Sequence, residues 1–131
     1  MTTASTPSSS ATLPDTLCYL NGEYSPLQDA KISVLDRGFI FGDGVYEVLP
    51  AYGGRIFRLD QHLARLDRSL AELRMANPLP REQWLMIARK LLADHAARSG
   101  AKDQIIYIQI TRGVAVRDHV MTDGIPPTVC V

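Results

Sequence analysis

This chain has few cysteines and lysines, and its formal net charge is zero. The cysteine count and the charge balance each argue against a class of protein. The two cysteines, Cys18 and Cys130, lie far apart without C-x-x-C neighbours, and the three histidines are scattered, so no zinc site is encoded. We expect two buried free thiols and a cytoplasmic protein. The 14 Lys and Arg residues balance 14 Asp and Glu residues, which argues against a nucleic-acid partner.

Long apolar runs are also missing, so we expect neither a membrane-spanning helix nor a membrane partner. The 131 residues, 46% of them hydrophobic, suit one globular domain or part of a larger one. Residues 2–10 contain only Thr, Ala, Ser and Pro. We therefore expect residues 1–15 to be a disordered tail, without the features of a secretory signal, before a folded domain at 16–131. The chain stops within an apolar run, which favours a natural protein that continues further.

Short apolar segments bounded by turn residues predict the strands. Asn21 and Gly22 together form a strong hairpin-turn signal, and Pro50 predicts an edge or a bulge in its strand. The predicted strands are 17–20, 31–35, 45–52, 55–59, 104–111 and 128–131.

Two amphipathic helices are predicted between these strands. Asp60 is a plausible N-cap for a helix with one apolar stripe, formed by Leu59, Leu63, Leu66, Leu70 and Leu73. A second helix is predicted over 81–98, with Gly100 ending it. Strands, then two helices, then strands is an α+β order. We therefore predict an antiparallel sheet with two helices packed on one face.

Four side chains are candidates for binding an anion or a carboxylate. Arg117 and His119 are two residues apart and project to the same side of an extended chain, where a guanidinium and an imidazole suit a carboxylate. A solvated face is the alternative. Tyr46 follows the glycine-rich stretch 38–44, which predicts an irregular loop or bulged strand and lacks nucleotide-loop spacing. We expect the phenol of Tyr46 either to enter a cleft or to pack in the core. We expect Tyr107 either to line a pocket or to face solvent.

Arg65 lies about 120° from the centre of the leucine stripe. The pattern alone therefore puts it in water or at a second interface. His62 is predicted to be a packing residue, and His95 a structural residue on the apolar face of the second helix. The residues taken alone predict an α+β domain with an anion or carboxylate pocket, and they encode no metal-ligand cluster.

Three longer stretches resemble one family. Residues 36–48, 59–66 and 108–113 are similar to the signature segments of class IV (fold type IV) pyridoxal-phosphate aminotransferases, and the resemblance covers about residues 16–131. The segment from Arg117 to His119 most resembles the D-amino acid transaminase (D-alanine aminotransferase) branch. The resemblance implies a small N-terminal domain of a two-domain enzyme that uses pyridoxal 5′-phosphate to move an amino group between D-amino acids and 2-oxo acids.

The resemblance also assigns site residues. By this resemblance, Arg117 and His119 match the pair that holds the substrate α-carboxylate by reaching across a homodimer into the partner's site, and Tyr46 matches a tyrosine of the same carboxylate trap. Tyr107 matches a tyrosine near the substrate pocket. Arg65 matches the arginine that binds the cofactor phosphate. This assignment replaces the position in water or at a second interface that the helical pattern predicts for Arg65.

The lysines do not fit the family pattern. The family forms a Schiff base through a lysine that follows the Arg-x-His segment, whereas Lys31, Lys90 and Lys102 all precede it. We therefore expect the chain alone to be inactive. Branched-chain aminotransferases and aminodeoxychorismate lyase share the glycine signature and remain alternatives. A non-catalytic binding or assembly module is a third.

Overall fold

The computed structural model describes residues 15–121 and 123–131. All of the expected tail except Asp15 therefore lies outside the described residues. The described part forms an antiparallel sheet with helices, which confirms the predicted α+β class. In chain order its elements are β1 (Leu17–Leu20), β2 (Glu23–Pro26), the 3-10 helix η1 (Leu27–Asp29), α1 (Arg37–Phe41), β3 (Gly44–Tyr52), β4 (Arg55–Ile56), α2 (Leu59–Glu72), α3 (Arg81–Ser99), β5 (Asp103–Thr111) and β6 (Thr128–Cys130).

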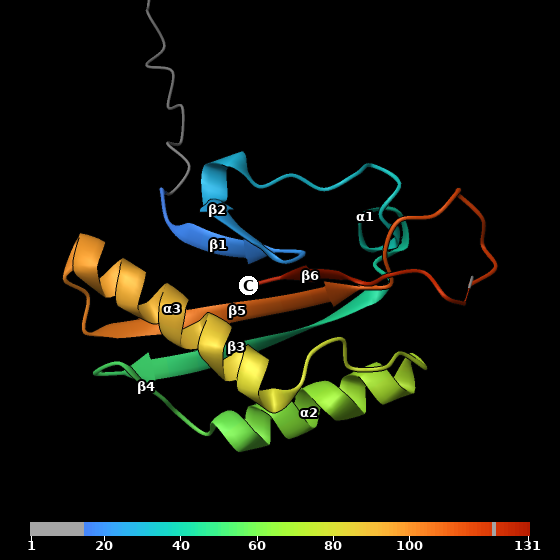
Figure 1. Cartoon of the computed structure of the whole chain (residues 1–131). Coiled ribbons are helices and arrows are strands. Elements are labelled where there is room, and N and C mark those ends of the chain that lie inside the picture. The colour runs from blue at the N-terminus through green and yellow to red at the C-terminus, as the bar shows by residue number, and fades with distance from the viewer. Residues whose placement is uncertain (1–14, 122) are drawn as a thin grey trace, which may run out of the picture.

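The six strands run in the order β2-β1-β6-β5-β3-β4 (Figure 1). β3 and β5 pair along their whole lengths, from Gly44 opposite Thr111 to Tyr52 opposite Asp103. β4 pairs only with the end of β3, so within residues 15–121 and 123–131 most of β3 forms a free edge. This explains how the sheet accommodates Pro50, and it confirms the edge interpretation of that residue.

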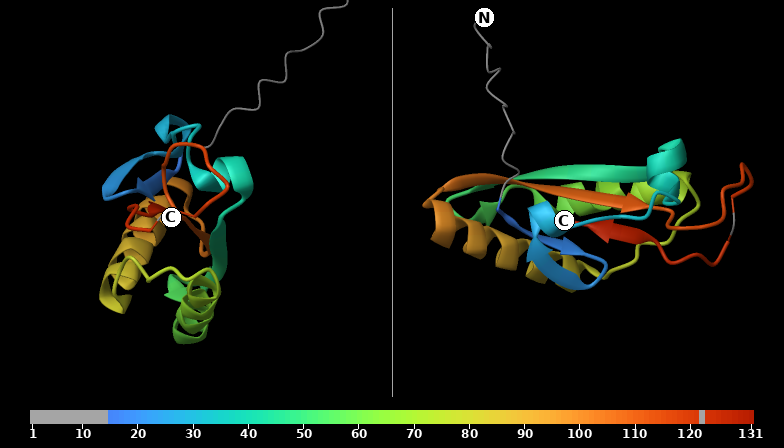
Figure 2. Two further views of the ribbon diagram at one scale, coloured as in Figure 1. Left: turned by 90° about the vertical axis from the view of Figure 1, so that its right-hand side faces the viewer. Right: turned by 90° about the horizontal axis from the view of Figure 1, so that it is seen from above.

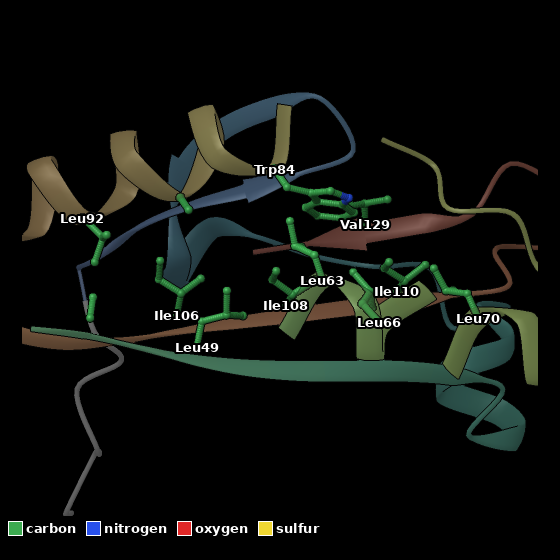
Figure 3. Packing of buried hydrophobic residues seen from close by; sticks show 12 residues of the cluster. Leu49, Leu63, Leu66, Leu70, Trp84, Leu92, Ile106, Ile108, Ile110 and Val129 are labelled. Atoms are coloured by element: carbon green, nitrogen blue, oxygen red, sulfur yellow. The ribbon is translucent and has the colours of Figure 1, made fainter. Parts of the chain in front are cut away.

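Helices α2 and α3 lie together on one face of the sheet, as predicted (Figure 2). The core forms where their apolar stripes meet alternate residues of β3 and β5. Figure 3 shows this packing around Trp84 and Leu66. The side chains that point to the other face of β3 and β5, including Tyr46 and Ile105, stay largely exposed.

Three local predictions are wrong. Residues 31–35 form a coil and turn rather than a strand. The glycine-rich stretch contains the short helix α1, capped by the Asp36 side chain, which accepts a hydrogen bond from the Gly38 amide. Helix α2 begins at Leu59, with Arg58 as its N-cap in a left-handed conformation, so Asp60 lies within the first turn. In addition, Cys130 is only partly buried, whereas Cys18 is buried as expected.

Two glycines bring α1 and β3 against the end of β5. A Cβ atom on Gly38 would collide with the Thr111 side chain, and one on Gly44 would lie 2.6 Å from the backbone oxygen of Ile110. Glycine is required at both positions by this close approach. The result is a tightly held corner where α1, β3 and the chain after β5 meet (Figure 1).

Candidate functional site

Glu47 forms a buried anionic centre between β3 and α2. It lies on the same strand face as the core residues Leu49 and Ala51, and its side chain is only 3% exposed. The carboxylate accepts hydrogen bonds from Arg65, at 3.0 Å from Nε and 2.6 Å from Nη2, and lies 2.8 Å from His62 Nδ1. Burial by itself would raise the pKa of Glu47, but Arg65 and His62 outweigh it and the pKa lies below its usual value.

Arg65 links this centre to the free edge of β3. Its side chain is 59% exposed even though Glu47 holds it. The Tyr46 phenol lies close enough to contribute to the raised pKa of Arg65, after the larger effects of Glu47. Arg65 is thus neither simply solvated nor buried. Glu47 fixes its position and leaves part of the guanidinium open to solvent.

Tyr46 and Tyr107 form an aromatic pair on the sheet face away from the helices. Their ring centroids are 5.8 Å apart in a stacked arrangement. The Tyr107 hydroxyl donates a hydrogen bond to Gln109 Oε1 at 2.7 Å. Partial burial, with a smaller effect of Tyr46, raises the pKa of Tyr107, so its phenol stays protonated at neutral pH. Both tyrosines remain accessible to a ligand.

The side chains of Arg37, Arg117 and His119 lie close to the Phe41 ring at the corner near α1. The His119 ring lies 5.5 Å from the Phe41 ring, and the Arg117 guanidinium lies 5.7 Å from it. Arg37 approaches the same ring at 4.8 Å and donates a hydrogen bond from Nη1 to the backbone oxygen of Asp118 at 2.7 Å. Arg117 and His119 therefore lie beside one aromatic ring. The Arg37 side chain holds the segment that carries them through a hydrogen bond to the backbone of Asp118.

Asp43 pairs with Arg37 and with Arg112 at this corner. Its Oδ2 atom accepts hydrogen bonds from Nε of Arg37 at 3.0 Å and Nε of Arg112 at 2.7 Å, and all three side chains are at most 10% exposed. Arg112 also donates to the backbone oxygen of Leu73. Burial alone would raise the pKa of Asp43, but the two guanidinium groups lower it overall. Asp43, Arg37 and Arg112 therefore form a buried ionic network, whereas Arg117 and His119 beside it are exposed to solvent.

The predicted site residues fall into two groups. Tyr46, Tyr107 and Arg65 cluster around β3, whereas Arg117 and His119 lie around Phe41. Within residues 15–121 and 123–131, no hydrogen bond or ring contact joins the first group to the second. The lysines lie elsewhere: for example, Lys90 of α3 packs over the Tyr24 ring, with Nζ 4.0 Å from its centroid.

Sequence reasoning missed the residues that hold this site together. It did not identify Glu47 as the partner of Arg65, and it treated His62 as a packing residue. Strand alternation carried the signal, because a glutamate in register with buried leucine and alanine needs a cationic partner. The roles of Asp43, Arg37 and Arg112 had no such signal, because their pairing depends on contacts between distant segments.

No cluster of three or more His, Cys, Asp or Glu side chains suited to a metal ion occurs within residues 15–121 and 123–131. None of the helices in the same residues combines the length and apolarity needed to cross a membrane.

Comparison with known proteins identifies relatives over most of the chain. Residues 44–131 match the family model for amino-transferase class IV. The D-alanine aminotransferase of Staphylococcus haemolyticus is 39% identical over 104 residues, covering 79% of this chain and 36% of the relative. That of Listeria monocytogenes is 37% identical over 108 residues, covering 82% and 36%. The chain thus spans about a third of the length of the curated relatives it matches.

Solved structures give the same fold. 4-Amino-4-deoxychorismate lyase from Pseudomonas aeruginosa is 32% identical with a TM-score of 0.64, covering 87% of this chain and 38% of the other. Branched-chain amino acid aminotransferase from Escherichia coli is 20% identical with a TM-score of 0.73, covering 88% and 38%. The fold IV transaminase from Curtobacterium pusillum, at 23% identity, has a TM-score of 0.70 and covers 82% and 35%. Since the family model matches more than half of its residues, the chain belongs to the class IV aminotransferases.

Proposed function

We propose that residues 16–131 are the small N-terminal domain of a pyridoxal-phosphate aminotransferase that moves an amino group between D-amino acids, such as D-alanine, and 2-oxo acids. The curated relatives named above support the D-amino acid preference. The whole enzyme acts as a homodimer in the cytoplasm, and the 131-residue chain by itself is inactive.

One observation carries this proposal: Arg117 and His119 are gathered around Phe41 on a segment whose backbone Arg37 holds. Holding the backbone of this segment limits the entropy that Arg117 and His119 lose when they bind a carboxylate. Arg117 offers a planar fork of donors that matches both carboxylate oxygens, and His119 adds a further donor. Tyr46 and Tyr107, which are exposed on the sheet face away from the helices, also line the substrate site.

The cofactor phosphate fits Arg65. The guanidinium has five N–H donors, and Glu47 engages it through Nε and Nη2 only, so donors remain for a phosphate. Glu47 holds the guanidinium in place, and the exposed fraction of 59% leaves room for an anion beside it. Pyridoxal phosphate, when bound, supplies the electron-withdrawing ring on which the amino group is exchanged. Lys31, Lys90 and Lys102 do not provide the amine that holds the cofactor covalently.

The alternative activity is that of a branched-chain aminotransferase or an aminodeoxychorismate lyase. The 32% identity with the lyase from Pseudomonas aeruginosa favours keeping it as the second candidate. The Arg-x-His segment favours the D-amino acid branch. A non-catalytic module would keep the fold without any of these activities.

The deciding experiment assays the full-length protein with pyridoxal phosphate, a 2-oxo acid and, in turn, D-alanine, L-leucine or 4-amino-4-deoxychorismate. Turnover of D-alanine well above that of the other two supports the proposal. A preference for L-leucine or for the chorismate amine overturns the D-amino acid assignment, and absence of all three activities favours the non-catalytic module. The 131-residue chain is assayed in parallel, and measurable D-alanine turnover by it would contradict its predicted inactivity.

A further inference from the structure

A cavity of about 330 Å³ lies between the turn that follows α2 and the stretch that precedes β6, at the end of the sheet where α2 finishes (Figure 1). Arg112, which directly follows β5, also lines this cavity. The other charged lining residues are Arg74 and Asp123, and the apolar ones include Met75, Pro78 and Ile125. Apolar walls with charges at a few points are typical of sites for small molecules, and the volume is near the lower end of their range, about 300 Å³.

Arg112 is buried, yet most of its donors have no acceptor within residues 15–121 and 123–131. Its side chain is 8% exposed. Of the five N–H groups of a guanidinium, Nε donates to Asp43 Oδ2 at 2.7 Å, and one N–H of Nη2 donates to the backbone oxygen of Leu73 at 2.8 Å. Two of the five groups are thus paired, and three remain on Nη1 and Nη2. Because buried donors are rarely left unpaired, these three groups need an acceptor in the cavity that Arg112 lines.

The charge around Arg112 favours an anion as that acceptor. Arg37 and Arg112 share one carboxylate, because Asp43 is the only acidic residue in the described part of the chain within ion-pair distance of either guanidinium. Asp36 is also buried, but it accepts its hydrogen bonds from two uncharged groups. One negative charge placed beside Arg112 would therefore balance the second guanidinium, whereas the larger charge of a phosphate group would exceed it.

We propose that this cavity binds a small aliphatic carboxylate, whose oxygens accept from the free Nη1 and Nη2 donors of Arg112 and whose aliphatic part contacts the apolar walls. A carboxylate matches the planar fork of a guanidinium. A purely inorganic anion would leave the apolar walls in contact with water, and a neutral apolar molecule would leave the buried donors unpaired. This inference does not depend on the proposed enzymatic function, because none of the candidate substrate and cofactor residues lines the cavity.

Two charged side chains on the rim should act on such a ligand in opposite directions. Arg74 and Asp123 are both exposed, and both line the cavity. The positive charge of Arg74 attracts a bound carboxylate, whereas the negative charge of Asp123 repels it. Removal of the first charge should therefore weaken binding, and removal of the second should strengthen it. A neutral ligand would respond to neither change.

The first test titrates the isotope-labelled chain with 3-methylbutyrate and with 3-methylbutanamide, a neutral molecule of nearly the same shape, and follows the backbone amide signals by NMR. The carboxylate should shift the signals of Met75, Ala76, Gly124 and Ile125 and should bind at least about tenfold more tightly than the amide, because its hydrogen bonds to Arg112 are charge-assisted. Equal binding of the two molecules would overturn the role of Arg112.

Two further outcomes of this titration would contradict the proposal. Inorganic phosphate is the third probe, and it should bind more weakly than the carboxylate because it leaves the apolar walls uncovered. Tighter binding of phosphate would overturn the assignment of the ligand class. Shifts confined to the neighbourhood of Arg117 and His119 would show that the carboxylate binds there and that the cavity does not take it.

The second test measures 3-methylbutyrate binding to variants that leave the buried network of Arg112 intact. Arg74 has a left-handed backbone with a φ of 56°, which asparagine tolerates. Arg74→Asn should raise the dissociation constant about twofold to fivefold, the effect of one exposed charge, and Asp123→Asn should lower it by a similar factor. Arg68→Asn, on the exposed side of α2, is the matched control and should leave it unchanged. Effects of the same sign in the Arg74 and Asp123 variants, or no effect in either, would overturn an anionic ligand.

A third variant tests the location of the ligand by size alone. Ala76 lines the cavity and is exposed, so Ala76→Leu should fill part of the space without disturbing the core. Binding of 3-methylbutyrate should then fall by at least about tenfold, because the ligand and the added side chain cannot occupy the same volume. Unchanged binding would place the ligand elsewhere and would overturn the proposal.

Discussion

Arg37 and Asp118 are 81 positions apart in the sequence, yet the Arg37 guanidinium donates a 2.7 Å hydrogen bond to the backbone oxygen of Asp118. The flanking residues of Asp118 are the two candidate carboxylate ligands. Arg37 of α1 thus helps to hold in place a segment that is distant from it in the sequence.

The substitution Arg37→Ala should loosen the segment around Asp118. Without the Nη1 hydrogen bond, we expect faster amide exchange in residues 114–121 and faster trypsin cleavage after Arg117, relative to exchange in β5. Arg68→Ala, on the exposed side of α2, is the control and should change neither rate. Unchanged cleavage in the Arg37 variant would show that other contacts hold the segment.

The substitution Arg117→Ala tests the carboxylate role in the full-length enzyme. Loss of a bidentate contact to the substrate should raise KM for the amino acid at least tenfold, or about 1.4 kcal/mol. Steady-state kinetics with D-alanine measure this, and Arg55→Ala, in the short strand β4, serves as control. An unchanged KM would remove Arg117 from the substrate site.

Glu47 should make stability depend on pH at the acid end. Its pKa is lowered by folding, so its contribution is fully present above its unfolded pKa, about 4.3, and is lost as pH falls through the folded value. Glu47→Gln should destabilise the chain by about 1–3 kcal/mol at pH 7, because Arg65 and His62 lose a charged partner.

Urea unfolding of wild type and variant at pH 7 and at successively lower pH checks this expectation. The difference between the two should shrink as the pH falls below about 4.3. Asp43 has a lowered pKa as well, but it is present in both proteins and cancels in the difference. A difference that does not vary with pH would mean that the Glu47 charge does not contribute to stability.

Gly38→Ala should destabilise the corner around α1. The added Cβ would collide with Cγ2 of Thr111, and such overpacking costs about 1–3 kcal/mol. Thr111→Ser removes that methyl group, so the double variant should recover part of the loss. Thermal unfolding of the three variants forms a double-mutant cycle, and strictly additive effects would argue against this contact.

Leu66→Ala should test the core between α2 and the sheet. Leu66 is fully buried, and such truncations cost about 2–5 kcal/mol. Met86→Ala, at a residue that is 60% exposed, should cost much less. Denaturant unfolding of both variants measures the contrast.

The sequence predicted well those elements whose residues follow one period. The leucine stripe of α2, the hairpin turn at Asn21 and Gly22 and the isoleucines of β5 were all identified, because local periodicity and turn chemistry decide them. Residues 31–35 were predicted as a strand from composition alone. They form a coil instead, since no neighbouring strand is available to pair with them among the described residues.

The candidate site was less predictable than the fold. Family resemblance supplied Arg65, Arg117 and His119, but it gave no account of what holds them. The residues that hold them in place are Glu47, Asp43 and Arg37. Each of these acts through a hydrogen bond between separate segments of the chain. The hydrogen bond from Arg112 to Asp43 spans 69 positions, and no spacing rule reaches that far.

The place of β6 in the sheet also has a consequence for the order of folding. Among the residues that the structure describes, the β1–β2 hairpin joins the rest of the sheet only through β6, where Asn21 and Val129 pair across 108 positions. A two-stranded hairpin alone is marginally stable in water. During synthesis, β1 and β2 must therefore wait for β6, and closure of this long loop should be slow compared with the formation of α2 and α3.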